Sequence, residues 1–170
     1  MIIRDYKPED RDAVERITYK AWSGVSIAHL REQRYGIIGG VPWQKQKAES
    51  ILRKCDTHPE QVIVAEIDGQ VVGYATLLFS QNGEIGVVGE NAVDPAYQGR
   101  GIGTQLIANI LDRLLAAGVR ILEVQTFEHD APARKVYERL GFELFAKTVH
   151  YTMTPEKARE HVAKYLQQNK

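Results

Sequence analysis

The sequence predicts an α/β fold in which a mixed α+β sheet begins with antiparallel strands and contains a central parallel pair. Strand-like patterns fill residues 62–93, where Asp68-Gly69 and Asn82-Gly83 supply two tight hairpin turns. An amphipathic stretch with helical period separates this region from a further strand-like run at 119–127. Because a helix between two strands allows a parallel, right-handed crossover, we expect a mixed sheet with helices on both faces.

The first third of the chain is expected to hold one short strand and three helices. Residues 1–4 form the strand candidate. Pro8-Glu9-Asp10 places a proline and two acids where a helix starts, and apolar residues follow at helical spacing. Further helices are predicted at 26–34 and 43–54, with an irregular loop that contains three glycines between them.

The middle of the chain supplies the predicted antiparallel strands and the crossover helix. The strands are expected at 62–67, 71–79 and 84–93. The helix is expected at 101–117, where an apolar stripe recurs at helical spacing, and Gly118 can end it in the left-handed conformation.

The last part of the chain is predicted to alternate strand and helix. After the strand at 119–127, a short helix around 133–140 is closed by Gly141. One or two strands are expected within 142–153, and a terminal helix with a thin apolar stripe is expected at 155–168.

The composition excludes several functional classes. Hydrophobic residues make up 44% and charged residues 26% of the chain, as in ordinary globular proteins, and 170 residues suit one domain that spans 1–170. The 22 basic and 22 acidic residues cancel, so neither nucleic acid nor a membrane is an expected partner. The charged N-terminus is unlike a signal peptide, and no apolar run approaches the ~18 residues of a membrane span. We therefore expect a cytoplasmic protein.

The turn after the strand at 84–93 is the most informative stretch. Asp94-Pro95 turns the chain, and three alternate glycines open an amphipathic helix, namely Gly99, Gly101 and Gly103. Free N–H groups at a helix start bind anions, and glycines let a pyrophosphate approach the backbone, while Arg100 and Thr104 can add donors. A turn that only starts a helix explains the glycines equally well. The spacing fits neither a P-loop nor the dinucleotide-binding fingerprint.

Two segments resemble conserved blocks of the GNAT-type N-acetyltransferase superfamily. Gln98-Gly99-Arg100-Gly101-Ile102-Gly103 is similar to its Gln/Arg-x-x-Gly-x-Gly/Ala signature, and residues 92–97 resemble its usual lead-in. Residues 130–142 resemble its second block, Asn-x-x-Ala-x-x-x-Tyr-x-x-x-Gly-Phe, with Ala133, Tyr137, Gly141 and Phe142 at the matching positions. The element order from residue 2 to residue 153 also matches. The resemblance thus covers nearly the whole chain and implies a GNAT-like fold.

The resemblance implies an enzyme that transfers an acetyl group from acetyl-CoA to a primary amine by direct amine attack. The residues that it places at the cofactor are Ala92, Val93, Gln98, Gly99, Arg100, Gly101, Ile102, Gly103, Thr104, Asp130, Ala133 and Tyr137. Asp130 stands where the family has asparagine and lacks the amide donor, which puts a cofactor contact there in doubt. The five histidines show no metal-ligand spacing, so no metal is expected.

Two residues are the catalytic candidates that the resemblance suggests. Tyr137 is the expected general acid that protonates the CoA thiolate, and a core residue on the helix stripe is the alternative. Glu90, on the strand before the turn, is the tentative general base, and a solvent-facing strand glutamate is the alternative. Glu84, Glu128 and His129 are weaker candidates for the base.

Other features leave the function partly open. Cys55 lies away from both matched blocks and is interpreted as structural. Arg31 and Arg34 can hold a carboxylate of the acceptor or can simply be solvated helix residues. The acceptor, a small molecule or a peptide, is not identified, and a homodimer is compatible with the sequence. The alternative function is a non-catalytic acyl-CoA-binding sensor or interaction domain, which would have no need of a proton donor at the sulfur.

Overall fold

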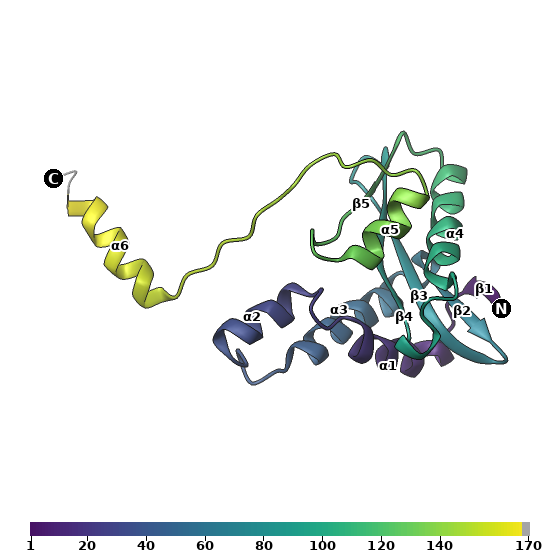
Figure 1. The fold of residues 1–170 in the computed structure, drawn as a ribbon, viewed down its shortest axis with the longest axis horizontal. Helices are drawn as coiled ribbons and strands as arrows, with labels where there is room; N and C mark the ends of the chain where they lie inside the picture. Colours follow the sequence, from purple (N-terminus) through teal and green to yellow (C-terminus); the bar gives the residue numbers. More distant parts are fainter. Residues whose placement is uncertain (168–170) are drawn as a thin grey trace.

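The computed structural model describes residues 1–167, which form one five-stranded sheet with the strand order β1-β2-β3-β4-β5 (Figure 1). The strands are β1 (Ile2–Asp5), β2 (Val62–Ile67), β3 (Gln70–Phe79), β4 (Ile85–Val93) and β5 (Ile121–Val124). Strands β1 to β4 pair antiparallel in series, and β4 pairs with β5 in parallel. The mixed sheet and its parallel pair were both predicted from the sequence, and the structure confirms them.

Helices cover both faces of this sheet, as the sequence predicted. The helices are α1 (Arg11–Ala21), α2 (Ile27–Tyr35), α3 (Trp43–Thr57), α4 (Ile102–Ala116), α5 (Ala131–Arg139) and α6 (Pro155–Gln167), with short 3-10 turns η1 (Pro8–Asp10), η2 (Pro59–Gln61) and η3 (Pro95–Tyr97). One apolar core joins α1 and α3 to the sheet, and a second core joins α4 and α5 to its other side. We call these sides the α1/α3 face and the α4/α5 face.

Local sequence features account for the hairpin and the crossover. Asp68 and Gly69 have φ values of 50° and 78°, as a two-residue turn with left-handed geometry requires. In α4, the predicted apolar stripe is buried from Ile102 to Leu114, whereas Leu115, which was expected in the same stripe, is exposed. A Cβ atom on Gly86 of β4 would lie only 2.8 Å from the Leu114 side chain, so glycine permits the close approach of α4 to the sheet.

Two predictions for the last part of the chain need correction. The strand expected at 119–127 is only four residues long, because β5 pairs with β4 from Ile121 to Val124 and no further. The strands expected within 142–153 are absent from the described structure. That segment is instead an extended connection that leads to α6, which stands apart from the domain (Figure 1). A strand pattern forms a strand only beside a partner, and this segment runs past the end of β5 rather than along it.

Candidate functional site

The parallel pair β4–β5 is split over its second half. Pairing joins Ile85–Val88 to Ile121–Val124, and β4 then continues for five more residues, Gly89–Val93, beyond the last pair. Within the described chain, this part of β4 pairs only with β3. Its other edge therefore offers backbone N–H and C=O groups to an extended ligand that carries amides.

A β-bulge lies in the middle of β4, where the split begins. The register with β3 places Asn91 opposite Ala75 but Val88 opposite Leu77, so Gly89 and Glu90 together face the single residue Thr76. A Cβ atom on Gly89 would overlap the Thr76 hydroxyl, so only glycine fits there. The bulge turns the Glu90 side chain toward the α1/α3 face.

Glu90 sits among hydrogen-bond donors and cations. Thr76 Oγ1 donates to Glu90 Oε2 at 3.4 Å, and Lys47 Nζ of α3 lies 3.6 Å from Glu90 Oε1. Burial acts to raise the pKa of the Glu90 carboxyl, but the positive charges of Lys47 and Lys54 and the hydrogen bonds to the carboxylate outweigh it. The pKa of Glu90 is consequently lowered, and the group is a carboxylate at neutral pH.

Lys47 links Glu90 to a buried polar cluster under the split. Its Nζ lies 3.8 Å from the centre of the Trp22 ring, and burial lowers the pKa of this lysine although Glu90 opposes the shift. The Trp22 indole donates to the Tyr74 hydroxyl at 2.9 Å, and that hydroxyl also bonds Thr18 Oγ1 at 2.9 Å. This charged and aromatic cluster forms a polar wall beside Glu90 on the α1/α3 face.

The glycine turn after β4 is built as a backbone cradle. Asp94 caps η3 by accepting from Ala96 N at 3.2 Å, and the Gln98 amide donates to Val93 O at 3.1 Å. Gly99 and Gly101 have φ values of 77° and 78°, which favour glycine strongly. The side-chain amide of Gln98, a residue expected at the cofactor, therefore stabilises the turn.

The start of α4 has no side-chain cap. Its N-cap residue is Gly101, and the first intrahelical bond is donated by Gln105 N to Gly101 O at 3.1 Å. The N–H groups of Ile102, Gly103 and Thr104 precede that bond, so they have no acceptor within the helix. Three donors at the positive end of a 15-residue helix are a feature that can attract an anion. The Ile102 side chain itself is buried in the core, so only its backbone is available to a ligand.

Asp130 caps α5 and also bonds the strand-side loop. Its Oδ1 accepts from Ala133 N at 3.2 Å, which caps α5, and its Oδ2 accepts from Thr126 Oγ1 at 2.7 Å. Both carboxylate oxygens are thus occupied by the protein itself. The two helices differ in this respect, because the Asp130 side chain caps α5 whereas no side chain caps α4.

Tyr137 of α5 places its hydroxyl at the split. The ring is buried and meets Phe142 edge-on, with centroids 6.1 Å apart. Burial raises the pKa of the phenol, a side-chain hydrogen bond with Asn91 opposes this shift, and the charge of Asp130 adds to it. Asn91 belongs to the unpaired edge of β4, so the phenol lies beside that edge and stays protonated at neutral pH.

The weaker candidates for a base are occupied elsewhere. Glu84 pairs with Arg120 at 3.2 Å and Glu128 with Lys147 at 2.6 Å, both on the exposed surface. His129 Nε2 lies 2.9 Å from Gly24 O, and this contact joins the loop before α5 to the loop before α2. Burial raises the pKa of the Cys55 thiol to about 11, so it is no nucleophile at neutral pH, in line with a structural role.

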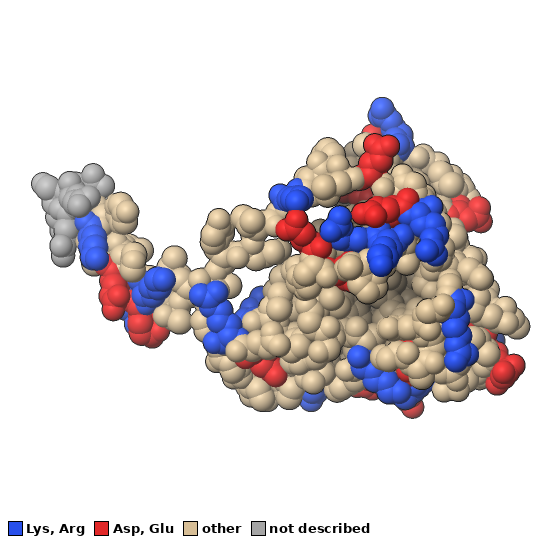
Figure 2. Space-filling view, viewed as in Figure 1, with Lys and Arg blue, Asp and Glu red and all other residues tan. Residues whose placement is uncertain are grey.

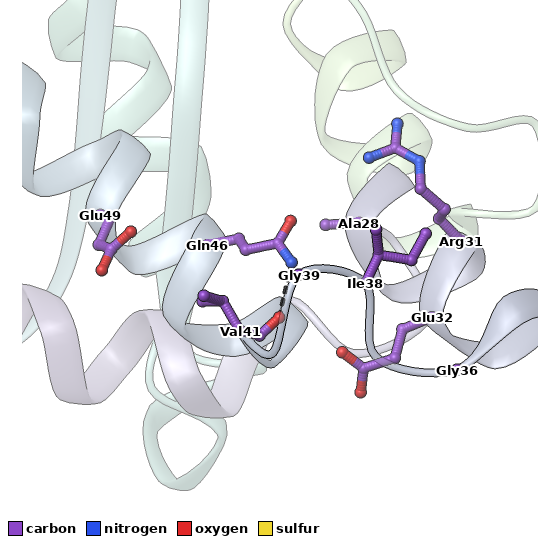
Figure 3. Close-up of a pocket in the computed structure, with 9 residues that line it drawn as sticks. All are labelled: Ala28, Arg31, Glu32, Gly36, Ile38, Gly39, Val41, Gln46 and Glu49. Atoms are coloured by element: carbon purple, nitrogen blue, oxygen red, sulfur yellow. Dashed lines mark hydrogen bonds between the residues drawn. The ribbon is translucent and has the colours of Figure 1, made fainter.

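A separate cavity of ≈ 270 Å³ lies between α2, the following loop and α3 (Figure 3). Its lining residues are Ala28, Arg31, Glu32, Gly36, Ile38, Gly39, Val41, Gln46 and Glu49. None of them belongs to β4, the glycine turn, α4 or α5, so this cavity is distinct from the split. Arg31 reaches it, whereas Arg34 lies over the ring of its neighbour Tyr35, 5.4 Å from its centre.

Three residues near the split were not on the list of expected site residues. Asn91, Lys47 and Trp22 each touch a candidate catalytic group or its partner. A signal for Lys47 existed, because it lies four residues before the buried Ile51 on α3 and so shares its apolar side. Asn91 was noticed only as a polar residue beside Glu90 on the strand before the turn, without a role.

Charged side chains of both signs lie on the surface. Basic and acidic side chains are interspersed over the face shown in Figure 2. No group of His, Cys, Asp and Glu in residues 1–167 is arranged to hold a metal ion. Within the same residues, no helix has the length and apolar character needed to cross a membrane.

Comparison with known proteins gives concordant matches. A family model described as "Acetyltransferase (GNAT) family" matches residues 24–142. A protein of Methanocaldococcus jannaschii named an uncharacterized N-acetyltransferase is 25% identical over 146 residues, which is 83% of this chain and only 60% of that protein.

Among solved structures, the ribosomal-protein-S18-alanine N-acetyltransferase of Escherichia coli superposes with a TM-score of 0.65 at 21% identity, over 91% of this chain and 85% of its own. A putative acetyltransferase of Salmonella typhimurium with acetyl-CoA superposes with a TM-score of 0.63 at 19% identity, over 85% and 80% of the two chains. At these identities the two structures support the fold alone.

Proposed function

This chain belongs to the acetyltransferase (GNAT) family, and from that premise we propose that it transfers an acetyl group from acetyl-CoA to a primary amine. One observation carries the proposal: the uncapped start of α4 lies near Val93 at the end of the unpaired stretch of β4, and Tyr137 interacts with Asn91 in the middle of the same stretch. An anion site, an amide-binding edge and a proton donor thus follow one another along Gly89–Val93. That order matches the pyrophosphate, the pantetheine arm and the thioester of acetyl-CoA.

The cosubstrate fits the residues on chemical grounds. The N–H groups of Ile102, Gly103 and Thr104 suit the pyrophosphate, and Arg100 is exposed beside them. A Cβ atom on Gly103 would approach only Val93, at 3.8 Å, so the space in front of this helix turn is open. The backbone of Ala92 and Val93 suits the pantetheine amides. The solved structure from Salmonella typhimurium, which carries acetyl-CoA on a similar fold, supports this assignment.

The reaction needs no further reactant. The amine nitrogen attacks the thioester carbonyl carbon, a C–N bond forms, and the C–S bond breaks. The amine loses one proton and the CoA thiolate gains one, so the two proton transfers balance. Tyr137 is protonated at neutral pH because its pKa is raised, and we assign it the proton donated to sulfur. The phenolate regains its proton from water.

Glu90 is suited to receive the amine rather than to act as a strong base. Its pKa is lowered, and a general base works best when its pKa lies near the operating pH. Its negative charge attracts the acceptor as an ammonium ion, and the proton then leaves through water. Lys47 keeps Glu90 charged and oriented toward the α1/α3 face, where the Trp22 ring forms the wall.

A weak base favours an acceptor that is partly neutral already. An α-amino group has a reference pKa of ~7.7–8.0, whereas a lysine side chain lies at ~10.4. At neutral pH a far larger fraction of α-amino groups is uncharged and able to attack. We therefore propose an α-amine, on a peptide or on a small molecule, as the acceptor class. The similar fold of the E. coli enzyme named for the alanine of a ribosomal protein supports the peptide alternative.

The test is a thiol-release assay with acetyl-CoA and paired peptides. One peptide has a free N-terminus and no lysine, and the other has a blocked N-terminus and one lysine. We expect thiol release and acetylation, detected by mass spectrometry, with the first peptide and little with the second. Tight CoA binding by calorimetry without turnover on any amine would instead establish the second candidate, a non-catalytic acyl-CoA-binding domain.

A further inference from the structure

Lys47 is an amine that the fold holds largely inside the domain. It lies on α3, one residue before the buried Ala48 and four before the buried Ile51, and its side chain is only 17% exposed. Lysine side chains are seldom buried without a partner, because removing an ammonium group from water is costly. The placement of Lys47 therefore depends on the groups around its nitrogen.

Two groups hold the Lys47 nitrogen in one place. Nζ lies 3.8 Å from the centre of the Trp22 ring and 3.6 Å from Glu90 Oε1. The ring is itself fixed, because its indole N–H donates at 2.9 Å to the hydroxyl of Tyr74, which is fully buried. Glu90 is fixed by the bulge in β4 and by the Thr76 hydroxyl. The nitrogen is thus positioned from two sides by rigid partners.

The Lys47 nitrogen stands where the proposed reaction needs an amine. The unpaired stretch Gly89–Val93 of β4 is the edge along which the thioester is proposed to lie. Tyr137 interacts with this stretch at Asn91, on the α4/α5 face. Lys47 meets the same stretch at Glu90, on the α1/α3 face. An amine at the position of Lys47 therefore approaches the thioester from the side opposite the proposed proton donor.

Burial also makes this amine a better nucleophile than an exposed lysine. Only a neutral amine attacks a carbonyl carbon, and a lysine in water has a pKa of ~10.4. Burial lowers the pKa of Lys47 and outweighs the opposing effect of the Glu90 charge. A larger fraction of Lys47 than of an exposed lysine is thus neutral at neutral pH. The handicap that makes external lysines poor acceptors is reduced for this one.

A second half-buried lysine on α3, Lys54, is placed differently. Burial lowers its pKa as well, but its Nζ donates to the main-chain oxygen of Leu77 on β3 at 3.5 Å. The position of that nitrogen is therefore set by the main chain of β3 and not by the Trp22 ring. Of these two lysines, Lys47 is the one that lies against Glu90 at the split.

We propose that Lys47 is itself an acetyl acceptor, so that the chain acetylates this side chain when acetyl-CoA is bound and no external amine is present. The inference rests on the proposed function, because the acetyl donor and its site are the same. The Lys47 ammonium releases a proton to water, and Nζ attacks the thioester carbonyl carbon. A C–N bond forms, the C–S bond breaks, the nitrogen loses its second proton to water, and the thiolate gains one proton from Tyr137. The products are one acetylated lysine, one CoA thiol and one proton in solvent.

Acetylation of Lys47 changes the acceptor side of the site. An acetylated lysine is neutral, so it loses its attraction to the Trp22 ring and to the Glu90 carboxylate. The added acetyl group also takes up space on the side from which an external amine approaches. The modified chain therefore acetylates external amines more slowly, and the chain limits its own activity when the acceptor is scarce.

Mass spectrometry of the unsubstituted chain after incubation with acetyl-CoA alone tests the inference. We expect acetylation of Lys47 to be at least about tenfold faster than that of the exposed Lys45 on the same helix, because a held amine reacts at a high effective concentration. The rate per chain should not depend on protein concentration, since the reaction occurs within one chain. Random chemical acetylation would instead modify Lys45 first, and that result would overturn the proposal.

Lys47→Arg and Lys45→Arg are matched variants for the same measurement. Arginine keeps the positive charge and can stay over the Trp22 ring, but it stays charged and therefore does not attack the thioester. The rapid incorporation of one acetyl group should disappear in Lys47→Arg and persist in Lys45→Arg, with unchanged circular dichroism spectra. Rapid incorporation that persists in a folded Lys47→Arg protein contradicts the proposal.

Protection by acceptor peptides supplies a measurement that needs no variant. Saturating peptide with a free N-terminus should slow the acetylation of Lys47 in the unsubstituted chain, whereas the peptide with a blocked N-terminus should not. The free amine and Lys47 approach the thioester from the same side, so they exclude each other. Labelling of Lys47 that a turned-over peptide leaves unchanged would show that Lys47 reacts outside the proposed site.

The outcomes separate this inference from the proposed function. Acetylation of the peptide with no label on Lys47 leaves the enzymatic proposal standing and overturns self-acetylation. Label on neither the peptide nor Lys47, with CoA still bound, overturns both. Preincubation with acetyl-CoA should slow later peptide turnover by the unsubstituted chain and leave Lys47→Arg at its own starting rate. Equal slowing of the two proteins would contradict the limiting effect of acetylated Lys47.

Discussion

Replacing Tyr137 with phenylalanine removes one hydroxyl from the proposed site and leaves the ring in place. The ring is 8% exposed and packs against Phe142, so the core beneath α5 should be preserved. Loss of the hydroxyl's interaction with Asn91 should lower the free energy of unfolding by at most the ~0.5–1.5 kcal/mol of one hydrogen bond. Loss of a general acid typically lowers turnover by ~10²-fold, which corresponds to ~2.7 kcal/mol in the activation free energy.

The assay for this variant measures kcat, KM and CoA affinity side by side. We expect kcat to fall about 10²-fold while CoA affinity stays within about twofold, since no cofactor-binding backbone is altered. Tyr6→Phe is the matched control, because Tyr6 is also buried but belongs to the α1/α3 core, and its activity should be unchanged. Full turnover in Tyr137→Phe, with the same alkaline limb in its pH profile, would refute the acid role.

The pH dependence of this residue has a definite sign. Burial raises the pKa of the Tyr137 phenol above its ordinary value of ~10, so the folded protein disfavours the phenolate. Its contribution to stability is fully present below pH ~10 and is lost as the pH rises through the raised pKa. Any alkaline loss of activity caused by Tyr137 should therefore begin above pH ~10, and Tyr137→Phe should abolish that part of the loss.

Two further variants test the rest of the site, and a third tests a buried carboxylate elsewhere in the fold. Gly101→Val should weaken CoA binding at least tenfold, as measured by calorimetry. The control is Gly118→Val, at the same φ of 78° beyond the other end of α4, which should cost similar stability and leave CoA affinity unchanged. Equal CoA affinity in the two variants would show that the pyrophosphate does not bind at this turn. Glu90→Gln should lower kcat/KM for the amine about 10–100-fold without weakening CoA binding, while Glu84→Gln should match the unsubstituted protein. An unchanged KM for the amine in Glu90→Gln would contradict the proposed role of Glu90 in binding the acceptor ammonium. Burial opposes ionisation of Asp10, yet hydrogen bonds from Arg4 and Lys7 lower the pKa of its carboxyl. The stabilising effect of the carboxylate is therefore present above pH ~4 and is lost as the pH falls through the lowered pKa. The difference in unfolding free energy between the unsubstituted protein and Asp10→Asn should shrink on acidification, and a constant difference would contradict this assignment.

The parts of the fold that sequence reasoning predicted well are those with strong local signals. The β2–β3 hairpin has a left-handed turn pair at Asp68-Gly69, and α4 has a complete apolar stripe, so their positions follow from short-range physics. The segment 142–153 is the opposite case. It was expected to form one or two strands, but strand formation depends on a partner that is distant in sequence, and the segment pairs with no strand in the described structure.

The candidate site shows the same division between local and distant information. The open helix start at Gly101 to Thr104 follows from glycines and a missing cap residue, both of which are visible in the sequence. Asp130 was expected at the cofactor with doubt attached because it lacks an amide donor, and its bonds from Ala133 N and Thr126 Oγ1, the second formed across the loop before α5, depend on the fold. The partner of Glu90, Lys47, lies 43 positions earlier in the chain, and only folding places them 3.6 Å apart.

The bulge in β4 explains why the sequence left the role of Glu90 undecided. In a regular strand, residues 88, 90 and 92 would all lie on one face, and Val88 belongs to the α4/α5 core. The extra residue at Gly89-Glu90 reverses the alternation, so that Ala92 belongs to the α1/α3 core and Glu90 meets Lys47 on that same side. Asn91 consequently faces Tyr137 on the α4/α5 side. One inserted residue thereby places two proposed catalytic groups on opposite sides of the same strand: the carboxylate that binds the amine and the phenol that protonates the thiolate. The amine can then attack the thioester from one side while the phenol protonates the sulfur from the other.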